Sequence, residues 1–190
     1  MTLEVLYRSL WQALELGVLD PAHAYHLGVL ATHGANARSV VLRSASAVPA
    51  QILIYSDRRA PKITEIEIDP RATLVVYGDR RQLRLRGRLS IHRDDALGDT
   101  CWEACPLSSR RAYLTADAPG TALNEPQSGL PAGLDQRPPT LEESAAGRAN
   151  FAVLELRIDA IDCLLLDPSG YRRAIFRVDA SAVTSSWCIP

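Results

Sequence analysis

Basic side chains recur in this sequence along a run that alternates polar and apolar residues, and again where a helix is predicted to begin. Such residues could bind an anion. The run 82–91 alternates strictly, with polar and mostly cationic residues at every second position and apolar residues or glycine between them. A second group, Arg58, Arg59 and Lys62, surrounds the start of a predicted helix at Pro61. Free backbone N–H groups and the positive end of the helix dipole attract anions there. A solvated sheet surface and a solvated turn explain the same residues without a ligand, so both interpretations stay open at this point.

The elements that must position these side chains are four short strand-like runs, at 38–43, 51–57, 72–77 and 82–91. Each run is rich in aliphatic or β-branched residues and is bounded by proline, glycine, serine or aspartate. This pattern is typical of antiparallel strands joined by hairpins and short crossovers. We therefore predict a β-meander core with one apolar face and one cationic face.

The remaining segments are predicted to surround this core. Apolar residues at helical spacing from Leu3 to Val18 predict an N-terminal helix that packs on the sheet. A strand at 27–32 is predicted to pair with the run at Ser39 after a turn at Asn36 and Ala37, and further helices are predicted to begin at Pro61, Asp94 and Leu107. A long surface loop is predicted at 118–150. The chain then continues with a predicted strand at 151–166, which has a bulge or bend near Ala160, and a last strand at 172–178.

Composition limits the class of protein. The 190 residues fit a single domain, 1–190, whose core needs neither metal nor disulfides. A formal net charge of -1 gives no basic field, so we expect no nucleic-acid partner. No apolar run reaches 18 residues and the first residues do not read as a signal peptide. We expect a soluble, cytoplasmic protein with no membrane contact.

The spacing of cysteine and histidine does not favour a metal site. Cys101 and Cys105 lie four apart on a predicted helix and could supply two ligands, but no third ligand is close in the sequence. Cys163, Cys188 and the 4 histidines are dispersed. The sequence therefore predicts no bound metal.

Four motifs in order resemble those of the pyridoxamine 5'-phosphate oxidase family, from Arg38 to Pro190. They are Arg-Ser-Val-Val-Leu-Arg at 38–43, Tyr55-Ser56 followed by Lys62, Arg-Gln-Leu-Arg-Leu-Arg-Gly at 81–87, and Arg173 followed by Trp187 and Pro190. The resemblance implies a mainly β (α+β) fold, the FMN-binding split β-barrel, which is an antiparallel Greek-key-like barrel with peripheral helices. It also implies a homodimer with FMN at the interface, and the 118–150 loop is suited to wrap the neighbouring subunit.

The resemblance also implies a set of cofactor contacts. Arg38 and Lys62 would hold the FMN phosphate, Gln82 would hydrogen-bond the isoalloxazine ring, and Arg173 would lie near the polar edge of the ring. The residues that would line the cofactor are Arg38, Ser39, Val40, Val41, Leu42, Arg43, Tyr55 and Ser56. A phosphate dianion needs two or more charge-assisted donors, which agrees with these residue types. No residue is assigned a catalytic role.

The sequence departs from the family at the positions that hold the substrate. The tyrosine and arginine that grip the phosphate of the vitamin substrate align with Cys101 and Cys105. The Gln-Ser pair that reaches the flavin from the partner aligns with Ala118 and Pro119, and a tryptophan aligns with Leu164. Pro61 stands where the family has a phosphate-binding arginine, so Arg58 or Arg59 is a candidate substitute. Arg110, Arg111 and Tyr113 either shape the open side of the flavin or take part in ordinary helix packing.

Three functions remain open from the sequence. The first is an FMN-dependent oxidoreductase with a small-molecule substrate, and the second is a module that binds, stores or reduces flavin without a dedicated substrate. The third is pyridoxamine 5'-phosphate oxidation in vitamin B6 salvage, with Arg43 as the remaining candidate for the substrate phosphate. The missing tyrosine and arginine argue against the third, because hydrogen bonds to a charged group contribute about 1.5–3 kcal/mol each. We therefore predict FMN binding without efficient oxidation of pyridoxamine phosphate.

Overall fold

The computed structural model describes residues 1–179 and 182–190, and the chain divides into two compact units. The first, called the barrel unit, comprises Met1–Ile54, Glu65–Ser90 and Glu155–Pro190. The second, called the helical unit, comprises Tyr55–Thr64 and Ile91–Leu154.

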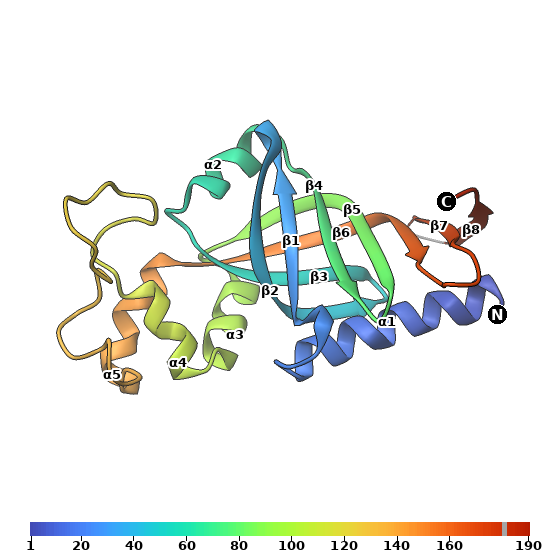
Figure 1. Cartoon of the computed structure of the whole chain (residues 1–190). Coiled ribbons are helices and arrows are strands. Elements are labelled where there is room, and N and C mark those ends of the chain that lie inside the picture. Colours follow the sequence, from blue (N-terminus) through green and yellow to red (C-terminus); the bar gives the residue numbers. More distant parts are fainter. Residues whose placement is uncertain (180–181) are drawn as a thin grey trace. The chain divides into compact units, whose positions relative to one another are not determined.

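Antiparallel strands form one sheet that closes on itself (Figure 1). The strand order is β3-β2-β1-β4-β5-β6-β7-β8, and an additional pairing between β3 and β6 closes the first six strands into a barrel. The segment β3-β2-β1-β4 is a Greek key, because the fourth strand returns to lie beside the first. The predicted split β-barrel is therefore confirmed. The predicted meander is wrong, because β4 pairs with β1 and not with β3. The strands are β1 (Leu27–Thr32), β2 (Asn36–Ala47), β3 (Ala50–Asp57), β4 (Arg71–Gly78), β5 (Arg81–His92), β6 (Phe151–Leu165), β7 (Arg172–Val178) and β8 (Val183–Cys188).

The alternation predicted for 82–91 is the alternation of burial along β5. Leu83, Leu85 and Leu89 are buried, while the arginines between them are exposed. Gly87 takes the remaining inward position because β5 passes very close to β6: a Cβ atom there would lie 1.9 Å from the carbonyl oxygen of Arg157. The glycine of the 81–87 motif is thus required by strand packing.

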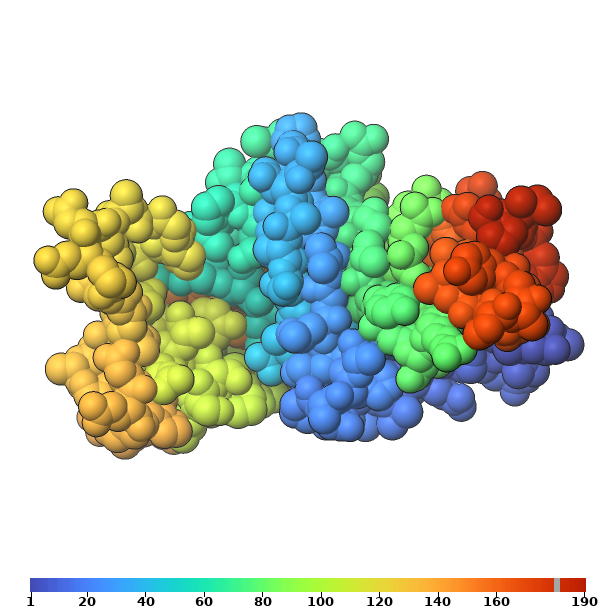
Figure 2. Space-filling model, in the orientation of Figure 1, coloured from blue at the N-terminus to red at the C-terminus, as the bar shows by residue number. Residues whose placement is uncertain are grey.

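Helix α1 (Leu3–Leu19) packs on the barrel through its apolar stripe. Thr2 caps its first turn by accepting a hydrogen bond from the Val5 amide at 3.3 Å, and Leu6, Leu10 and Leu14 are almost fully buried. The hairpin of β7 and β8 lies beside the first turns of this helix (Figures 1 and 2). The predicted N-terminal helix is confirmed.

The helical unit contains short helices separated by irregular chain. Four aromatic rings form its centre: Tyr55, Trp102, Tyr113 and Phe151, with ring centroids between 4.9 and 6.0 Å apart. No helix described in the structure is long and apolar enough to span a membrane. Besides α1, the helices of the chain are α2 (Pro61–Ile68), α3 (Ala96–Ala104), α4 (Leu107–Arg110) and α5 (Leu141–Ser144), with 3-10 turns η1 (Ala24–His26), η2 (His33–Ala35), η3 (Arg111–Tyr113) and η4 (Ala145–Asn150).

Three predicted boundaries are wrong. The turn after β1 lies at His33–Ala35, because Gly34 adopts a positive φ of 75° there and Asn36 already pairs with Thr32. Residues 172–178 are followed by another strand, β8, whose serine- and threonine-rich, largely exposed sequence lacks an apolar signal. The helix predicted from Leu107 to Ala116 changes to a 3-10 turn after Arg110.

Two further predictions concern the second half of the chain. The last part of the predicted 118–150 loop is helical: α5 begins with a capping box between Thr140 and Glu143, and η4 follows it up to Asn150. In β6 the alternation of buried and exposed residues ends at Ala160, where the sequence predicts the change of apolar phase. Residues Ala160–Leu165 nevertheless pair with β7 in unbroken register.

Candidate functional site

The guanidinium of Arg38 is held by an acid within the barrel unit. Arg38, at the start of β2, donates from Nη2 to the Glu65 carboxylate at 2.6 Å, and the Thr32 hydroxyl contacts both side chains. The side chains of Arg38 and Glu65 are 23% and 16% exposed, so this ion pair is largely shielded from water. The residue predicted to bind a phosphate is therefore pre-oriented by a carboxylate.

The rest of the 38–43 motif alternates between the core and the outer surface. Val40 and Leu42 are buried in the barrel, whereas Ser39 is exposed and Val41 is partly exposed. The pairing of β2 with β3 shifts register between Leu42 and Ser44, which places Arg43 at an irregularity. Only alternate residues of this predicted cofactor segment can therefore present their side chains to a ligand outside the barrel.

Asp162 joins Arg173 to the polar face of β5. Arg173 donates to both carboxylate oxygens of Asp162, at 3.0 and 2.7 Å, and Arg84 donates to the same carboxylate. Burial by itself would raise the pKa of Asp162, but the hydrogen bonds and charges of the two arginines outweigh burial and lower this pKa below its usual value. The hydrogen bond to Asp162 also raises the pKa of Arg173. Arg173 is thus fixed in orientation by a partner that is charged at neutral pH.

Gln82 borders an apolar area on the outer face of the barrel. Gln82 pairs with Tyr77 on β4. Val75, two residues before Tyr77 on the same strand, pairs with Val29 on β1. Leu27, Val29 and Tyr77 are 55%, 44% and 59% exposed. The amide of Gln82 and the two arginines Arg84 and Arg173, at the border of an apolar surface, suit a flat ligand with one polar edge.

In the helical unit, Lys62 and Ser56 form a small donor pair. The Lys62 ammonium donates to the Ser56 hydroxyl at 3.1 Å, and Ser56 is only 4% exposed. Tyr55, the other residue of this motif, packs its ring against Phe151 at 4.9 Å. The motif thus combines one cation, one hydroxyl and one aromatic ring.

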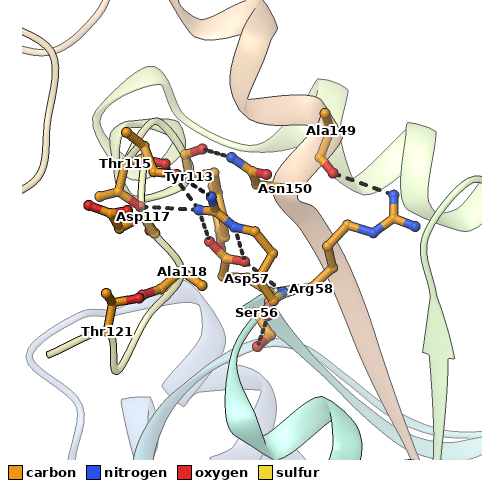
Figure 3. Close-up of polar contacts among 12 residues, drawn as sticks. Ser56, Asp57, Arg58, Tyr113, Thr115, Asp117, Ala118, Thr121, Ala149 and Asn150 are labelled. Atoms are coloured by element: carbon orange, nitrogen blue, oxygen red, sulfur yellow. Dashed lines mark hydrogen bonds and ion pairs between the residues drawn. The ribbon is translucent and has the colours of Figure 1, made fainter.

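Arg58 and Arg59, the suggested substitutes for a phosphate ligand, are engaged with acids. Arg59 pairs with the buried Asp57 through Nε at 3.0 Å and Nη2 at 2.7 Å, and the hydrogen bond raises the pKa of Arg59. Arg59 also donates to the backbone carbonyls of Thr115 and Ala116. Figure 3 shows Arg58 reaching the Ala149 carbonyl on the other side, and its guanidinium also pairs with Asp94 at 3.2 Å. Both arginines therefore hold loops together in this unit.

The sequence left open whether Arg110 and Tyr113 shape the open side of a flavin or take part in helix packing. The structure places both in the packing of the helical unit. Arg110 is 7% exposed, lies over the Trp102 ring at 4.7 Å, and donates to the carbonyls of Cys105 and Glu103. Tyr113 is also 7% exposed and stacks edge-on against Phe151. Arg111 donates to the Leu134 carbonyl at 3.2 Å.

The two cysteines that replace substrate-binding residues are buried. Burial raises the pKa of the Cys101 thiol, and a hydrogen bond with Tyr55 only partly offsets that effect. Cys105 is 3% exposed. Neutral, buried thiols supply no charged donor for a phosphate.

Sequence reasoning missed the acids that hold these arginines: Asp57, Glu65 and Asp162. Asp57 had a local signal, since it lies two residues before Arg59. Glu65 and Asp162 had none, because they are 27 and 78 residues from Arg38 and Arg84.

Within the described ranges, no group of three or more histidine, cysteine, aspartate or glutamate side chains is arranged to bind a metal.

Solved structures with the same fold cover the whole chain. No protein-family model matches the sequence. No curated protein sequence matches it either. A pyridoxamine 5'-phosphate oxidase-related, FMN-binding protein from Nostoc punctiforme PCC 73102 has a TM-score of 0.76 at 22% identity and covers 100% of both chains. PhzG from Burkholderia lata 383, in complex with tetrahydrophenazine-1-carboxylic acid, has a TM-score of 0.69 at 14% identity and covers 98% of this chain and 91% of its own.

A more distant structure has the same arrangement of elements. General stress protein 26 from Bacillus anthracis has a TM-score of 0.51 at 17% identity and covers 89% of this chain and 98% of its own. At these identities the likeness establishes the fold. The structural neighbours are thus pyridoxamine 5'-phosphate oxidase-related and general stress protein 26 proteins, as the motifs of the sequence predicted.

Proposed function

We propose that this protein binds FMN and acts as a flavin-dependent oxidoreductase on a small organic molecule. The observation that carries the proposal is the full-length match of its fold to an FMN-binding protein, together with cationic and amide side chains at the motif positions. When bound, FMN supplies the transfer of hydride or electrons through its isoalloxazine ring. The residues of this chain would bind and orient it.

The donors available in each unit fit the chemistry of FMN. In the barrel unit, we assign phosphate binding to Arg38 and contacts with the polar edge of the ring to Gln82 and Arg173. In the helical unit, we assign phosphate binding to Lys62 and Ser56, whose ammonium and hydroxyl are already hydrogen-bonded to each other. Glu65 holds the Arg38 side chain in one orientation, which lowers the entropy lost on binding a phosphate.

We also propose that the protein is a homodimer with FMN at the interface. The exposed apolar area around Leu27, Val29 and Tyr77 supports this, since a second copy would cover it. Sedimentation of FMN-loaded protein as a monomer would contradict the dimer. The cytoplasmic location expected from the sequence stays a prediction.

A second candidate function is flavin binding without a dedicated substrate. The burial of Cys101 and Cys105 favours it over oxidation of pyridoxamine phosphate, because the family's two charged or hydroxyl donors are absent at those positions. Reduction of the bound flavin by NAD(P)H, followed by reoxidation with a defined organic product, would decide for the enzyme.

The test is to titrate FMN and riboflavin into the protein and follow the visible absorption and fluorescence of the flavin. We expect FMN to bind at least about tenfold more tightly than riboflavin, and Arg38→Ala to remove most of that preference. Arg8→Ala is the matched control, since Arg8 is an exposed arginine paired only with Glu4 on α1. Arg38→Met/Glu65→Met removes the ion pair as a unit and separates loss of the phosphate donor from damage by an unpaired Glu65. No flavin binding by the unmodified protein would overturn the proposal.

A further inference from the structure

A groove of about 570 Å³ opens on the barrel unit, and none of its lining residues is among those assigned to FMN above, although one of them, Thr32, contacts Arg38. Its volume is within the range of sites for small organic ligands. It draws residues from β1, β4, β5, β6 and β7, so a rigid sheet supports it. The lining residues are Ala31, Thr32, Arg71, Ala72, Thr73, Arg86, Gly87, Asp159, Ala160 and Arg177.

Two of the arginine side chains that line the groove are available to bind a ligand. Arg86 and Arg177 are exposed, and their side chains make no hydrogen bond or ion pair with any residue that the structure describes. Arg71 is different, because Asp69 holds its guanidinium at 2.6 Å. The other charged residue of the lining is Asp159. Two unpaired guanidinium groups against one carboxylate make this a site for an anion.

Small side chains lie between these arginines. Ala72, Gly87 and Ala160 are buried and belong to the lining of the groove. Gly87 cannot be enlarged, because a Cβ atom would collide with the backbone of β6. These small residues form the apolar floor of the groove, which can contact the body of a ligand.

We propose that this groove binds a small organic anion, a carboxylate or phosphate ester with a compact apolar body. Arg86 and Arg177 would donate to its charged oxygens, and the alanine and glycine floor would contact its apolar part. Neither arginine is among the residues assigned to FMN, so the proposal does not depend on flavin binding.

The experiment uses phenyl phosphate and benzoate as anionic probes and benzyl alcohol as the neutral probe, each titrated into the full-length protein by calorimetry. We expect dissociation constants of about 1 mM or tighter for at least one anion and no binding of the alcohol. Arg86→Gln/Arg177→Gln should weaken that binding at least about tenfold. The same double variant should keep the FMN affinity of the unmodified protein.

The matched control is Arg88→Gln. Arg88 is an exposed arginine two residues further along β5 that does not line the groove, so its loss changes the net charge in the same sense. We expect it to retain anion binding within about twofold of the unmodified protein, as expected for a surface charge outside the site. Circular dichroism spectra and melting temperatures confirm that each variant is folded.

Three results would overturn the proposal. The first is no measurable binding of either anion by the unmodified protein, as when a second copy of the chain fills the groove. The second is equal binding of benzyl alcohol, which would mean that charge is not recognised. The third is an equal loss of affinity in Arg88→Gln and in the groove double variant, which would indicate only a general electrostatic attraction.

Discussion

The barrel unit and the helical unit satisfy their backbone polar groups in different ways. In the barrel unit the strands pair with each other, and alternate side chains enter a continuous apolar core. In the helical unit, residues 114–140 contain neither helix nor strand, so carbonyl groups need other donors. Arginines supply some of them: Arg59 and Arg111 donate to carbonyls of this segment. Arg110 and Arg148 donate to backbone carbonyls elsewhere in the unit.

This difference changes how a cluster of arginines should be interpreted. Arg58, Arg59 and Lys62 have the composition of an anion site, yet Arg58 and Arg59 are engaged by Asp94 and Asp57. On the barrel, Arg86 and Arg177 have no such partner among the described residues. The availability of a guanidinium therefore depends on which acids and carbonyls the fold brings near it, and composition does not reveal this.

The largest effect should come from enlarging Gly87, which tests whether strand packing dominates the barrel unit. Gly87→Ala would place a methyl group 1.9 Å from the Arg157 carbonyl oxygen. We expect a loss of about 3 kcal/mol or more in the free energy of unfolding, or failure to fold. Urea denaturation measures it, with Arg88→Ala as the control at the neighbouring exposed position, expected within about 0.5 kcal/mol. An unchanged urea midpoint for Gly87→Ala would contradict the close approach of β5 and β6.

The second-largest loss of stability should come from removing an arginine that donates to backbone carbonyls in the helical unit. Arg110→Met keeps an apolar side chain against Trp102 but leaves the carbonyls of Cys105 and Glu103 without their donor. We expect a loss of about 2–4 kcal/mol, since each buried unsatisfied group costs about 1–3 kcal/mol. Hydrogen exchange should rise at residues 103–110 in particular.

The control for this substitution is Arg137→Met, which removes an arginine paired only with Glu143 and a neighbouring carbonyl at the surface. It should leave the unfolding midpoint unchanged, because exposed ion pairs contribute little. Equal destabilisation by the two substitutions would mean that burial of Arg110 is not what stabilises the unit.

A smaller effect should come from Asp162→Asn, which removes the charge between Arg84 and Arg173. We expect a loss of about 1–2 kcal/mol at neutral pH, a value reduced for the partial exposure of both arginines. The pKa of Asp162 is lower in the folded protein than in the unfolded chain. Its stabilising contribution is therefore complete at neutral pH and is lost as the pH falls through the folded-state pKa.

Denaturation curves between pH 7 and pH 3 test this sign. The difference in stability between the unmodified protein and Asp162→Asn should narrow as the solution becomes more acidic. Asp159→Asn, at an exposed position of the same strand, is the control and should change the stability at neutral pH by no more than about 0.5 kcal/mol. A gap that widens in acid would contradict the lowered pKa.

The smallest effect should appear at the exposed pair of Asp69 and Arg71, as a titration shift alone. Hydrogen bonds from the Arg71 side chain and backbone lower the pKa of Asp69 to about 2. Arg71→Gln removes the side-chain donor, so the pKa should rise toward the ordinary value of about 4. Carboxyl NMR titration measures it, with Arg8→Gln as the control that leaves Asp69 unchanged. An Asp69 pKa near its ordinary value in the unmodified protein would show that the pair does not form in solution.

Individual strands of the barrel were predictable because their signal is local, whereas its closure was predicted from the family resemblance. The alternation from Gln82 to Ile91 records the two faces of β5 directly, and hydrophobic spacing does the same for α1. The turn at Gly34 was misplaced because Asn36 and Gly34 are both common turn residues, and only the pairing register separates them. Strand β8 was missed because its exposed serines and threonine pair with β7 without entering the core.

The chemical state of the candidate site was less predictable. The basic residues were identifiable from motifs, but their acidic partners come from distant segments, as with Arg84 and Asp162. For Arg110 the sequence allowed a role at a ligand or in packing, and only its place over Trp102 decides between them. Long-range ion pairs depend on tertiary geometry, which no spacing rule encodes.

The pairing of β3 with β6 has a consequence for how the chain folds during synthesis. The end of β3 at residue 57 and the start of β6 at residue 151 are 94 positions apart (151 − 57), and β6 also pairs with β5. The ribosome must therefore release most of the polypeptide before either free edge of the nascent five-stranded sheet is covered. Contacts of such high sequence separation form slowly, and uncovered edges invite pairing with other chains. We therefore expect the chain to be most prone to aggregation in the interval before β6 is synthesised.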